Sequence, residues 1–243
     1  ITALPAWIGS PALPGVLQQA DSSVLQVHAV LSPQQGLFDG SLALRWVRQY
    51  ASVTPKPFRV ALPAYGMALL GFDAQGAQVE SESSLRVAGN GRELTVAPQQ
   101  IADFLQTLAQ QTPPQLRGII WFRLPLADDR RAWSLATLRA VIERQPLNVD
   151  WQVKFRPQPQ QNGLYDLIIH NNGPVDAPLP QEVAIRADDC LAADAVGNYR
   201  LESAPQRQRF IRISGDQLRA GQSRPLGWLR CQQLTPGGTL VTP

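Results

Sequence analysis

The chain has 243 residues, enough for one large domain or two ordinary ones, and 44% of them are hydrophobic, so a folded protein is expected. The formal net charge is only +3, and the 22 basic residues form no run of like charge, which argues against nucleic acid as a partner. No apolar stretch reaches the roughly 18 to 20 residues that a membrane-spanning helix needs.

The two cysteines, Cys190 and Cys231, both fall in the last third of the chain. A disulfide in an exported protein is one interpretation of this pair, and two free buried thiols are the other. The chain starts without Met inside an apolar run, which predicts a processed or truncated product, and loss of a signal peptide with the missing part is one way to reach it. We therefore expect an exported protein.

Residues 1–146 alternate between strand-like and helix-like stretches. The clearest helix begins at Pro98, because Ile101, Phe104, Leu105 and Leu108 follow at the i, i+3, i+4, i+7 spacing. A β-hairpin insertion at about 72–97 is expected around the Asn-Gly pair at 90–91. The expected order is strand 1–7, helix 11–20, strand 24–30, a helix around 42–50, strand 58–65, the insertion, helix 98–108, strand 118–124 and a helix from Ser134.

Four strand-helix units call for a parallel sheet covered by helices. The expected strands 24–30, 58–65 and 118–124 each have one apolar face and one mixed face, whereas strands of an open sheet buried on both sides are apolar throughout. This pattern favours half of a (β/α)₈ TIM-type barrel, which closes at about 250 residues. We expect residues 1–146 to be the C-terminal half, with four preceding units as its partner.

The stretch from Gly118 to Leu124 is the predicted closing strand. Side chains alternate along a strand, so Ile120, Phe122 and Leu124 are expected to face an apolar neighbour, and Trp121 and Arg123 to face the opposite way. The face with Trp121 and Arg123 is the first candidate for a site.

Beyond residue 146 the pattern changes to short alternating strands separated by turns rich in Gln, Pro, Asn and Gly. We expect residues 147–243 to form a small antiparallel β-sandwich. Its aromatic residues are expected either to form a carbohydrate-stacking platform or simply to fill the core, and they are Trp151, Tyr165, Tyr199 and Trp228.

A resemblance rests on two motifs. Pro63-Ala64-Tyr65-Gly66, then an inserted β-rich segment, then Gly118-Ile119-Ile120-Trp121 resembles the last two strands of chitinase-type (family-18-like) glycoside hydrolase barrels. The whole chain is more similar to the C-terminal portion of an uncharacterised bacterial barrel family of unknown function, distantly similar to those hydrolases. The resemblance implies an exported bacterial protein of the periplasm, outer envelope or extracellular space, with polysaccharide or oligosaccharide as its partner.

In the chitinase-type enzymes the Tyr and Trp of these strands line the sugar site. The preceding strand commonly ends in Met-x-Tyr-Asp, where this chain has Leu25-Gln26-Val27-His28. The catalytic carboxylate motif would fall before Ile1, so the catalytic residues are unknown. Asp128 and Asp129 follow a site strand, but a loop role is the simpler interpretation of both.

The predicted substrate-binding residues come from the strand ends, and they are Trp7, Gln26, His28, Tyr65, Trp121 and Arg123. For His28 a satisfied interior histidine is an equal alternative, and for Tyr65 and Trp121 core packing is one. Two histidines without a ligand-spaced cluster predict no metal, and the lack of a phosphate-binding glycine loop predicts no cofactor.

Three functions remain open. The first is a glycoside-hydrolase-like, carbohydrate-active exported protein. The second is a non-catalytic carbohydrate-binding or envelope structural protein with a degenerate barrel site. The third is a purely structural half-barrel that pairs with a partner chain, since a four-stranded half exposes its sheet edges.

Overall fold

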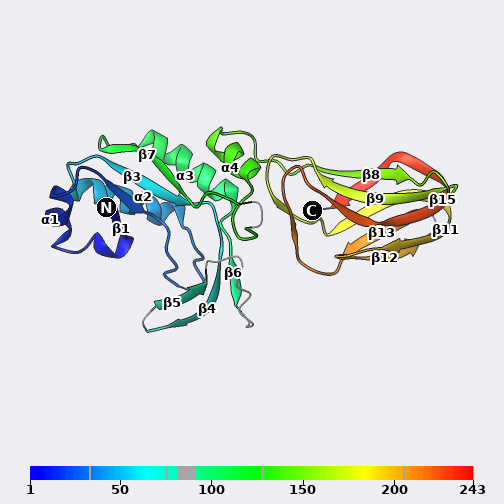
Figure 1. Cartoon of the computed structure of the whole chain (residues 1–243), viewed down its shortest axis with the longest axis horizontal. Helices are drawn as coiled ribbons and strands as arrows, with labels where there is room; N and C mark the ends of the chain where they lie inside the picture. Colours follow the sequence, from blue (N-terminus) through cyan, green and yellow to red (C-terminus); the bar gives the residue numbers. More distant parts are fainter. Residues whose placement is uncertain (33, 75, 81–90, 127–128, 205, 243) are drawn as a thin grey trace. The chain divides into compact units, whose positions relative to one another are not determined.

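The structure is a computed structural model that describes residues 1–32, 34–74, 76–80, 91–126, 129–204 and 206–242. The chain divides into two compact units, Ile1–Arg144 and Gln145–Pro243. Together they make a mixed α/β protein with a substantial antiparallel sheet, which confirms the expected fold class at that level (Figure 1). The half-barrel and the sandwich stay predictions.

The first unit is built on a parallel sheet of four strands in the order β1-β2-β3-β7. A second, antiparallel sheet has the order β5-β4-β6 and is called the insertion sheet here. The elements are β1 (Thr2–Ala3), the 3-10 helix η1 (Pro5–Trp7), α1 (Leu13–Gln18), β2 (Ser23–Gln26), α2 (Gly40–Val53), β3 (Phe58–Pro63), β4 (Met67–Asp73), β5 (Gly76–Glu80), β6 (Arg92–Leu94), α3 (Pro98–Gln110), β7 (Leu116–Phe122) and α4 (Leu135–Ile142).

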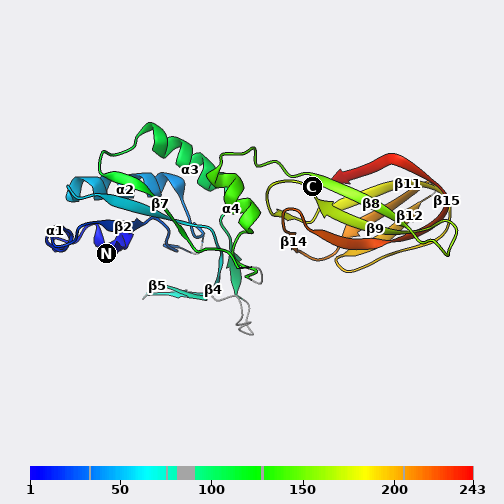
Figure 2. The same cartoon turned by 45° about the horizontal axis from the view of Figure 1, so that its top comes forward.

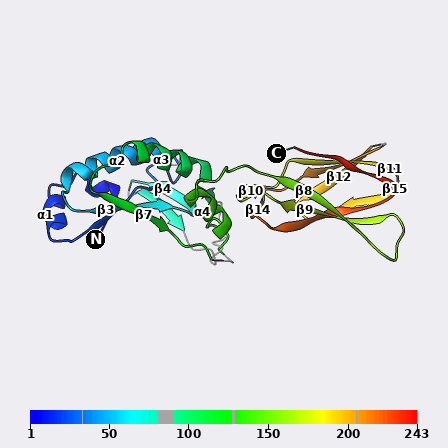
Figure 3. The ribbon, with the colours of Figure 1, turned by 90° about the horizontal axis from the view of Figure 1, so that it is seen from above.

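Two long helices lie side by side against the parallel sheet (Figure 3). Helix α3 has Pro98 in its first turn and buries Ile101, Phe104 and Leu108, so the predicted helical spacing is confirmed. Helix α2 begins after Asp39, whose carboxylate accepts a hydrogen bond from the Leu42 N–H at 2.8 Å. The buried apolar stripes of these helices therefore form the core with the sheet.

The start of the chain differs from the expected strand 1–7. Only Thr2–Ala3 pair with β2, and the chain then turns into η1. Pro5 explains the difference, because its ring fixes φ and it has no N–H to donate to a sheet. Strand β2 is also shorter than predicted and ends at Gln26.

The insertion sheet extends from the carboxyl end of β3, away from the helices (Figures 1 and 2). Its strands β4 and β6 pair from Met67 opposite Leu94 to Leu69 opposite Arg92. An insertion of this kind was predicted, but its Asn-Gly turn involves residues 81–90, which lie outside the described residues.

The second unit contains a six-stranded antiparallel sheet in the order β12-β13-β11-β15-β9-β8, and a two-stranded pair, β10-β14. Its core includes Leu167, Ile185 and Phe210, and the predicted core packing holds for Tyr199, which is 4% exposed. The strands are β8 (Trp151–Pro157), β9 (Leu164–Asn171), β10 (Ala177–Pro178), β11 (Glu182–Ala195), β12 (Tyr199–Ala204), β13 (Arg207–Arg212), β14 (Gln217–Leu218) and β15 (Ser223–Thr242).

Cys190 and Cys231 form a disulfide between β11 and β15, where they are paired directly across the two strands. The alternative of two free thiols is therefore wrong. The bond closes a sequence separation of 41 residues and limits the conformational freedom of the unfolded second unit.

Candidate functional site at the carboxyl ends of three parallel strands

Polar and aromatic side chains gather where three parallel strands end. His28 lies two residues beyond the last residue of β2, and Tyr65 lies two residues beyond the last residue of β3. Phe122 is the last residue of β7, and Arg123 follows it. Because parallel strands end at one edge of the sheet, these side chains meet there, and open α/β sheets bind ligands at that edge. With Asp129 they are called the carboxyl-edge cluster.

Three rings form the apolar part of the cluster. The ring centroids of His28 and Tyr65 are 5.8 Å apart, those of His28 and Phe122 are 5.9 Å apart, and those of Tyr65 and Phe122 are 5.3 Å apart. Tyr65 meets both partners edge-on, at interplanar angles of 79° and 71°. Such edge-to-face contacts are favourable for aromatic rings and fix their orientation. Phe122 is 47% exposed, whereas Tyr65 and His28 are buried.

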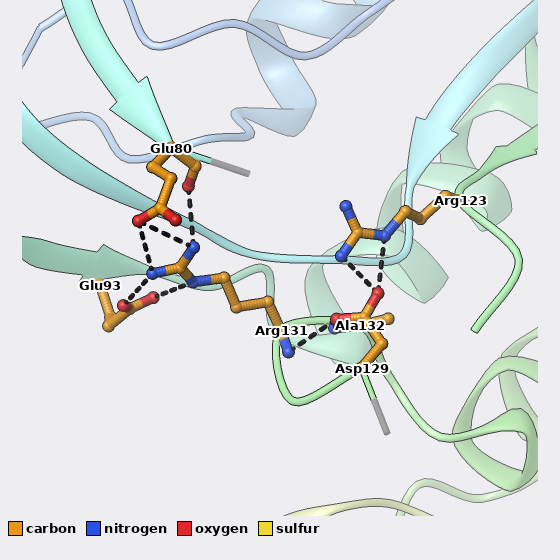
Figure 4. Close-up of polar contacts among 6 residues, drawn as sticks. All are labelled: Glu80, Glu93, Arg123, Asp129, Arg131 and Ala132. Carbon is orange, nitrogen blue, oxygen red and sulfur yellow. Dashed lines mark hydrogen bonds and ion pairs between the residues drawn. The ribbon is translucent and has the colours of Figure 1, made fainter. Parts of the chain in front are cut away.

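An ion pair borders the rings. The guanidinium carbon of Arg123 lies 5.6 Å from the centroid of the Tyr65 ring. Its Nε donates to Asp129 Oδ2 at 2.7 Å, and Nη2 contacts the same oxygen (Figure 4). The other oxygen of Asp129 accepts from the backbone N–H groups of Arg131 and Ala132, at 3.0 and 3.1 Å. Asp129 is thus a structural anion with both oxygens engaged.

The ionisation of these groups follows from their surroundings. Burial raises the pKa of Asp129, but the hydrogen bond from Arg123 and those from the backbone of Ala132 and Arg131 outweigh burial and leave the pKa below its ordinary value. Burial raises the pKa of Tyr65, partly opposed by the charge of Arg123. At neutral pH Asp129 is therefore a carboxylate and Tyr65 a neutral phenol.

His28 is the unusual member of the cluster. It is 2% exposed, and within the described part of the chain neither ring nitrogen has a hydrogen-bond partner. Burial lowers its pKa from 6.5 to about 4, while the Ala61 backbone acts in the opposite direction without forming a hydrogen bond of normal geometry. The ring is neutral at physiological pH, and an unsatisfied buried polar group of this kind costs about 1–3 kcal/mol.

The structure brings together three of the six predicted site residues: His28, Tyr65 and Arg123. Gln26 lies in β2, and its Nε2 donates to the backbone carbonyl of His28 at 3.0 Å, so it supports the loop that carries the histidine. Trp7 lies in η1 and is 44% exposed.

The burial of the closing strand alternates as predicted, with Ile120, Phe122 and Leu124 exposed and Trp121 and Arg123 partly buried, but the expected apolar neighbour of the exposed face is not found among the described residues. Trp121 lies beside Trp133, with ring centroids 6.4 Å apart, while Arg123 lies against Tyr65. Arg123 lies one residue beyond the end of β7, and its side chain forms an ion pair with Asp129. Ile120 and Leu124, expected to face an apolar neighbour, are 38% and 69% exposed.

Sequence reasoning assigned no binding role to two residues of the cluster. Phe122 was expected on the apolar face, and Asp129 was interpreted as a loop residue. The sequence feature that could have indicated a role for Asp129 is its position six residues after Arg123, but an acidic residue at this spacing is common for purely structural reasons. Asp128 lies outside the described residues.

The described residues contain no group of three or more His, Cys, Asp or Glu side chains placed to hold a metal ion. None of the helices there is both long and apolar enough to cross a membrane.

Comparisons with known proteins give two family matches. Residues 1–127 match the family model described as Domain of unknown function (DUF3142), and residues 154–232 match the one described as Domain of unknown function (DUF8456). No curated protein matches the chain.

Two solved structures are similar at low TM-scores. A family GH18 chitinase from Chromobacterium violaceum is 13% identical, with a TM-score of 0.34, over 100% of this chain and 60% of the chitinase. Chitinase ChiA74 from Bacillus thuringiensis is 8% identical, with a TM-score of 0.35, over 99% of this chain and 65% of the chitinase. The chain thus spans less than two thirds of either chitinase, and a likeness this weak carries no argument about activity.

Proposed function

The chain belongs to the family described as Domain of unknown function (DUF3142), and from this premise we propose that it is an exported carbohydrate-binding protein of glycoside-hydrolase-like architecture. The carboxyl-edge cluster is its proposed binding site, and a polysaccharide or oligosaccharide its ligand. The disulfide between Cys190 and Cys231 supports export, because such bonds persist in oxidising compartments.

One observation carries the proposal: a half-exposed aromatic ring is fixed in place beside a cation. Tyr65 and His28 hold the inner side of Phe122, so its outer face is an apolar platform at the sheet edge. The guanidinium of Arg123, ion-paired with Asp129, adds a polar group next to that platform. Ligand sites combine apolar or aromatic surface with a few placed polar groups in this way. A pyranose ring, with one apolar face and peripheral hydroxyls, matches both parts.

The arrangement favours binding over hydrolysis. Glycoside hydrolysis commonly uses two carboxyl groups that flank the scissile bond, one of them able to give a proton. Asp129 is the carboxyl group of the cluster within the described residues, and its lowered pKa and engaged oxygens suit neither role. Hydrolysis is the second candidate, favoured by the position of the cluster at the carboxyl ends of parallel strands.

The proposal includes a structural partner for β7. In the described sheet β7 is an edge strand, and Ile120 and Phe122 are exposed on it. Exposed apolar edges of this kind are normally paired or covered. We assign that role to the remaining strand-helix units of a TIM-type barrel, which would place the platform of Phe122 inside the barrel mouth.

The test is a titration of the protein with neutral, N-acetylated and uronic acid tetrasaccharides, followed by tryptophan fluorescence. Phe122→Ala is expected to weaken binding about tenfold, equivalent to about 1.4 kcal/mol, because the platform is lost. Phe72→Ala is the matched control, since Phe72 is 42% exposed in the insertion sheet and outside the cluster.

Wild-type affinity in Phe122→Ala, or an equal loss in both variants, would contradict the assigned site. Preference for the uronic acid would assign Arg123 to a carboxylate of the ligand. Release of reducing ends by the wild-type protein would favour the hydrolase over the binding protein.

A further inference from the structure

The segment from Asp129 to Trp133 contacts both the carboxyl-edge cluster and the insertion sheet. Asp129 binds the side chain of Arg123. The backbone of the segment pairs with the chain around Tyr65: Gly66 N–H donates to the Arg131 carbonyl at 2.6 Å, and Trp133 N–H donates to the Ala64 carbonyl at 2.9 Å. This short segment thus contacts both Arg123 and the chain around Tyr65, two residues of the proposed site.

The same segment is tied to the insertion sheet through the Arg131 side chain (Figure 4). Its Nε and Nη2 donate to the two carboxylate oxygens of Glu93 on β6, at 3.1 and 2.8 Å. Its Nη1 donates to the backbone carbonyl of Glu80 at the end of β5, at 3.1 Å, and lies 3.4 Å from the Glu80 carboxylate. Because two guanidinium nitrogens bind the same carboxylate, both the orientation of the Arg131 side chain and its distance from Glu93 are fixed.

Three observations make this tie firm. The Arg131 side chain is 15% exposed and that of Glu80 is 11% exposed, so the ion pair is only weakly screened by solvent. Trp133 adds a second tie, because its Nε1 donates at 2.8 Å to the carbonyl of Val96, beyond β6. Finally, a Cβ on Gly66 would lie 2.6 Å from the Leu94 carbonyl oxygen, so β6 packs directly against the strand end that carries Tyr65.

We infer that Arg131 is a positioning residue that couples the insertion sheet to the Arg123–Asp129 pair. Its side chain is held by β5 and β6, and its own N–H is one of the two backbone donors to Asp129. A displacement of the insertion sheet therefore moves the donor that fixes Asp129, and with it the guanidinium of Arg123. The coupling itself is independent of the ligand, whereas its effect on affinity rests on the proposed function.

The test compares wild type with Arg131→Met and Arg131→Lys in the full chain. Carboxyl-carbon NMR follows the titration of Asp129, and hydrogen exchange follows the Ala132 amide that donates to it. In Arg131→Met the pKa of Asp129 is expected to rise toward its ordinary value, and the Ala132 amide to exchange about tenfold faster. Arg131→Lys should restore part of both effects, because lysine keeps the charge but lacks the fork.

Arg139→Met is the matched control, since Arg139 forms an exposed i, i+4 pair with Glu143 on α4. It should leave both signals unchanged. Glu93→Gln gives the same readout while Arg131 keeps its contacts with Glu80, so the test does not depend on Arg131→Met folding. Wild-type values for Asp129 and Ala132 in Arg131→Met and Glu93→Gln would overturn the inference.

Tetrasaccharide affinity, measured on the same variants, separates the two proposals. Moved Asp129 signals with weaker binding support both. Moved Asp129 signals in a protein whose wild type binds no tetrasaccharide would leave the coupling in place and contradict the proposed function. Asp129 signals that do not change in a protein that binds sugar at Phe122 would contradict the coupling and leave the proposed function in place.

Discussion

Each unit of the chain contains a buried polar side chain, and the two side chains differ in their hydrogen bonding. Asn171 in the second unit is 0% exposed, and its amide donates to the carbonyls of Val175 and Leu218, at 2.8 and 3.0 Å. Its Oδ1 accepts from the Gly173 N–H at 3.1 Å. His28 in the first unit is 2% exposed, and its ring nitrogens have no such partners within the described residues.

The difference separates a structural role from a functional one. Asn171 gives hydrogen bonds to the buried backbone at Gly173, Val175 and Leu218, so it stabilises the second unit. The ring nitrogens of His28 have no hydrogen-bond partner of normal geometry among the described residues, so its burial costs free energy. Local violations of this kind are expected at functional sites, and this one lies against Tyr65 and Phe122.

The largest expected effect is at Asn171. Asn171→Leu keeps the approximate size of the side chain but removes three hydrogen bonds to buried backbone groups. We expect the free energy of unfolding of the second unit to fall by about 4 kcal/mol. Native-state hydrogen exchange at Leu167 measures that unit separately, and the first unit, followed at Val60, should not change. A loss below about 1 kcal/mol would show that Asn171 is not the structural member of the comparison.

The next effect is the pH dependence of the first unit. The pKa of His28 is about 4 in the folded protein, whereas the ordinary value of 6.5 applies to the unfolded chain. Between pH 4 and pH 6.5 the unfolded chain therefore binds a proton at His28 and the folded chain does not. Stability is therefore fully present above pH 6.5 and falls as the pH drops toward 4, by about 3 kcal/mol.

Hydrogen exchange at Val60 between pH 7 and 4 measures this loss. The control is His28→Leu, in which the loss across this window should disappear. The same variant should be about 1 kcal/mol more stable than wild type at pH 7, because an unsatisfied buried group is replaced by an apolar one. An unchanged pH profile in His28→Leu would assign the dependence to another group.

The sequence predicts those parts of the structure that a local pattern determines, and it does not predict those that depend on contacts between distant residues. The spacing of Ile101, Phe104 and Leu108 was sufficient for α3, because a helix buries one periodic face. The strand-end positions of His28 and Tyr65 were sufficient to bring them together, because parallel strands end at one edge.

Arg123 shows why the rest could not be predicted. Its position was predicted but its partner was not, since the ion pair with Asp129 forms with a loop residue, where no sequence period applies. The ties of Arg131 to Glu80 and Glu93 join residues 51 and 38 positions apart, and no local pattern indicates them. Phe122 was assigned to the apolar face from alternation alone, which does not show that this face is exposed.

The central claim is that sugar binds at the carboxyl-edge cluster, and the two histidines of the chain allow a direct measurement. Imidazole NMR signals of His28 and His170 are followed while the 243-residue chain is titrated with the tetrasaccharide that it binds best. His170 is the internal control, because it lies in the second unit with Nδ1 2.9 Å from Ser223 Oγ. The account predicts that the His28 signals shift with the affinity given by fluorescence while those of His170 stay constant. Saturation with sugar while the His28 signals remain unmoved would contradict it.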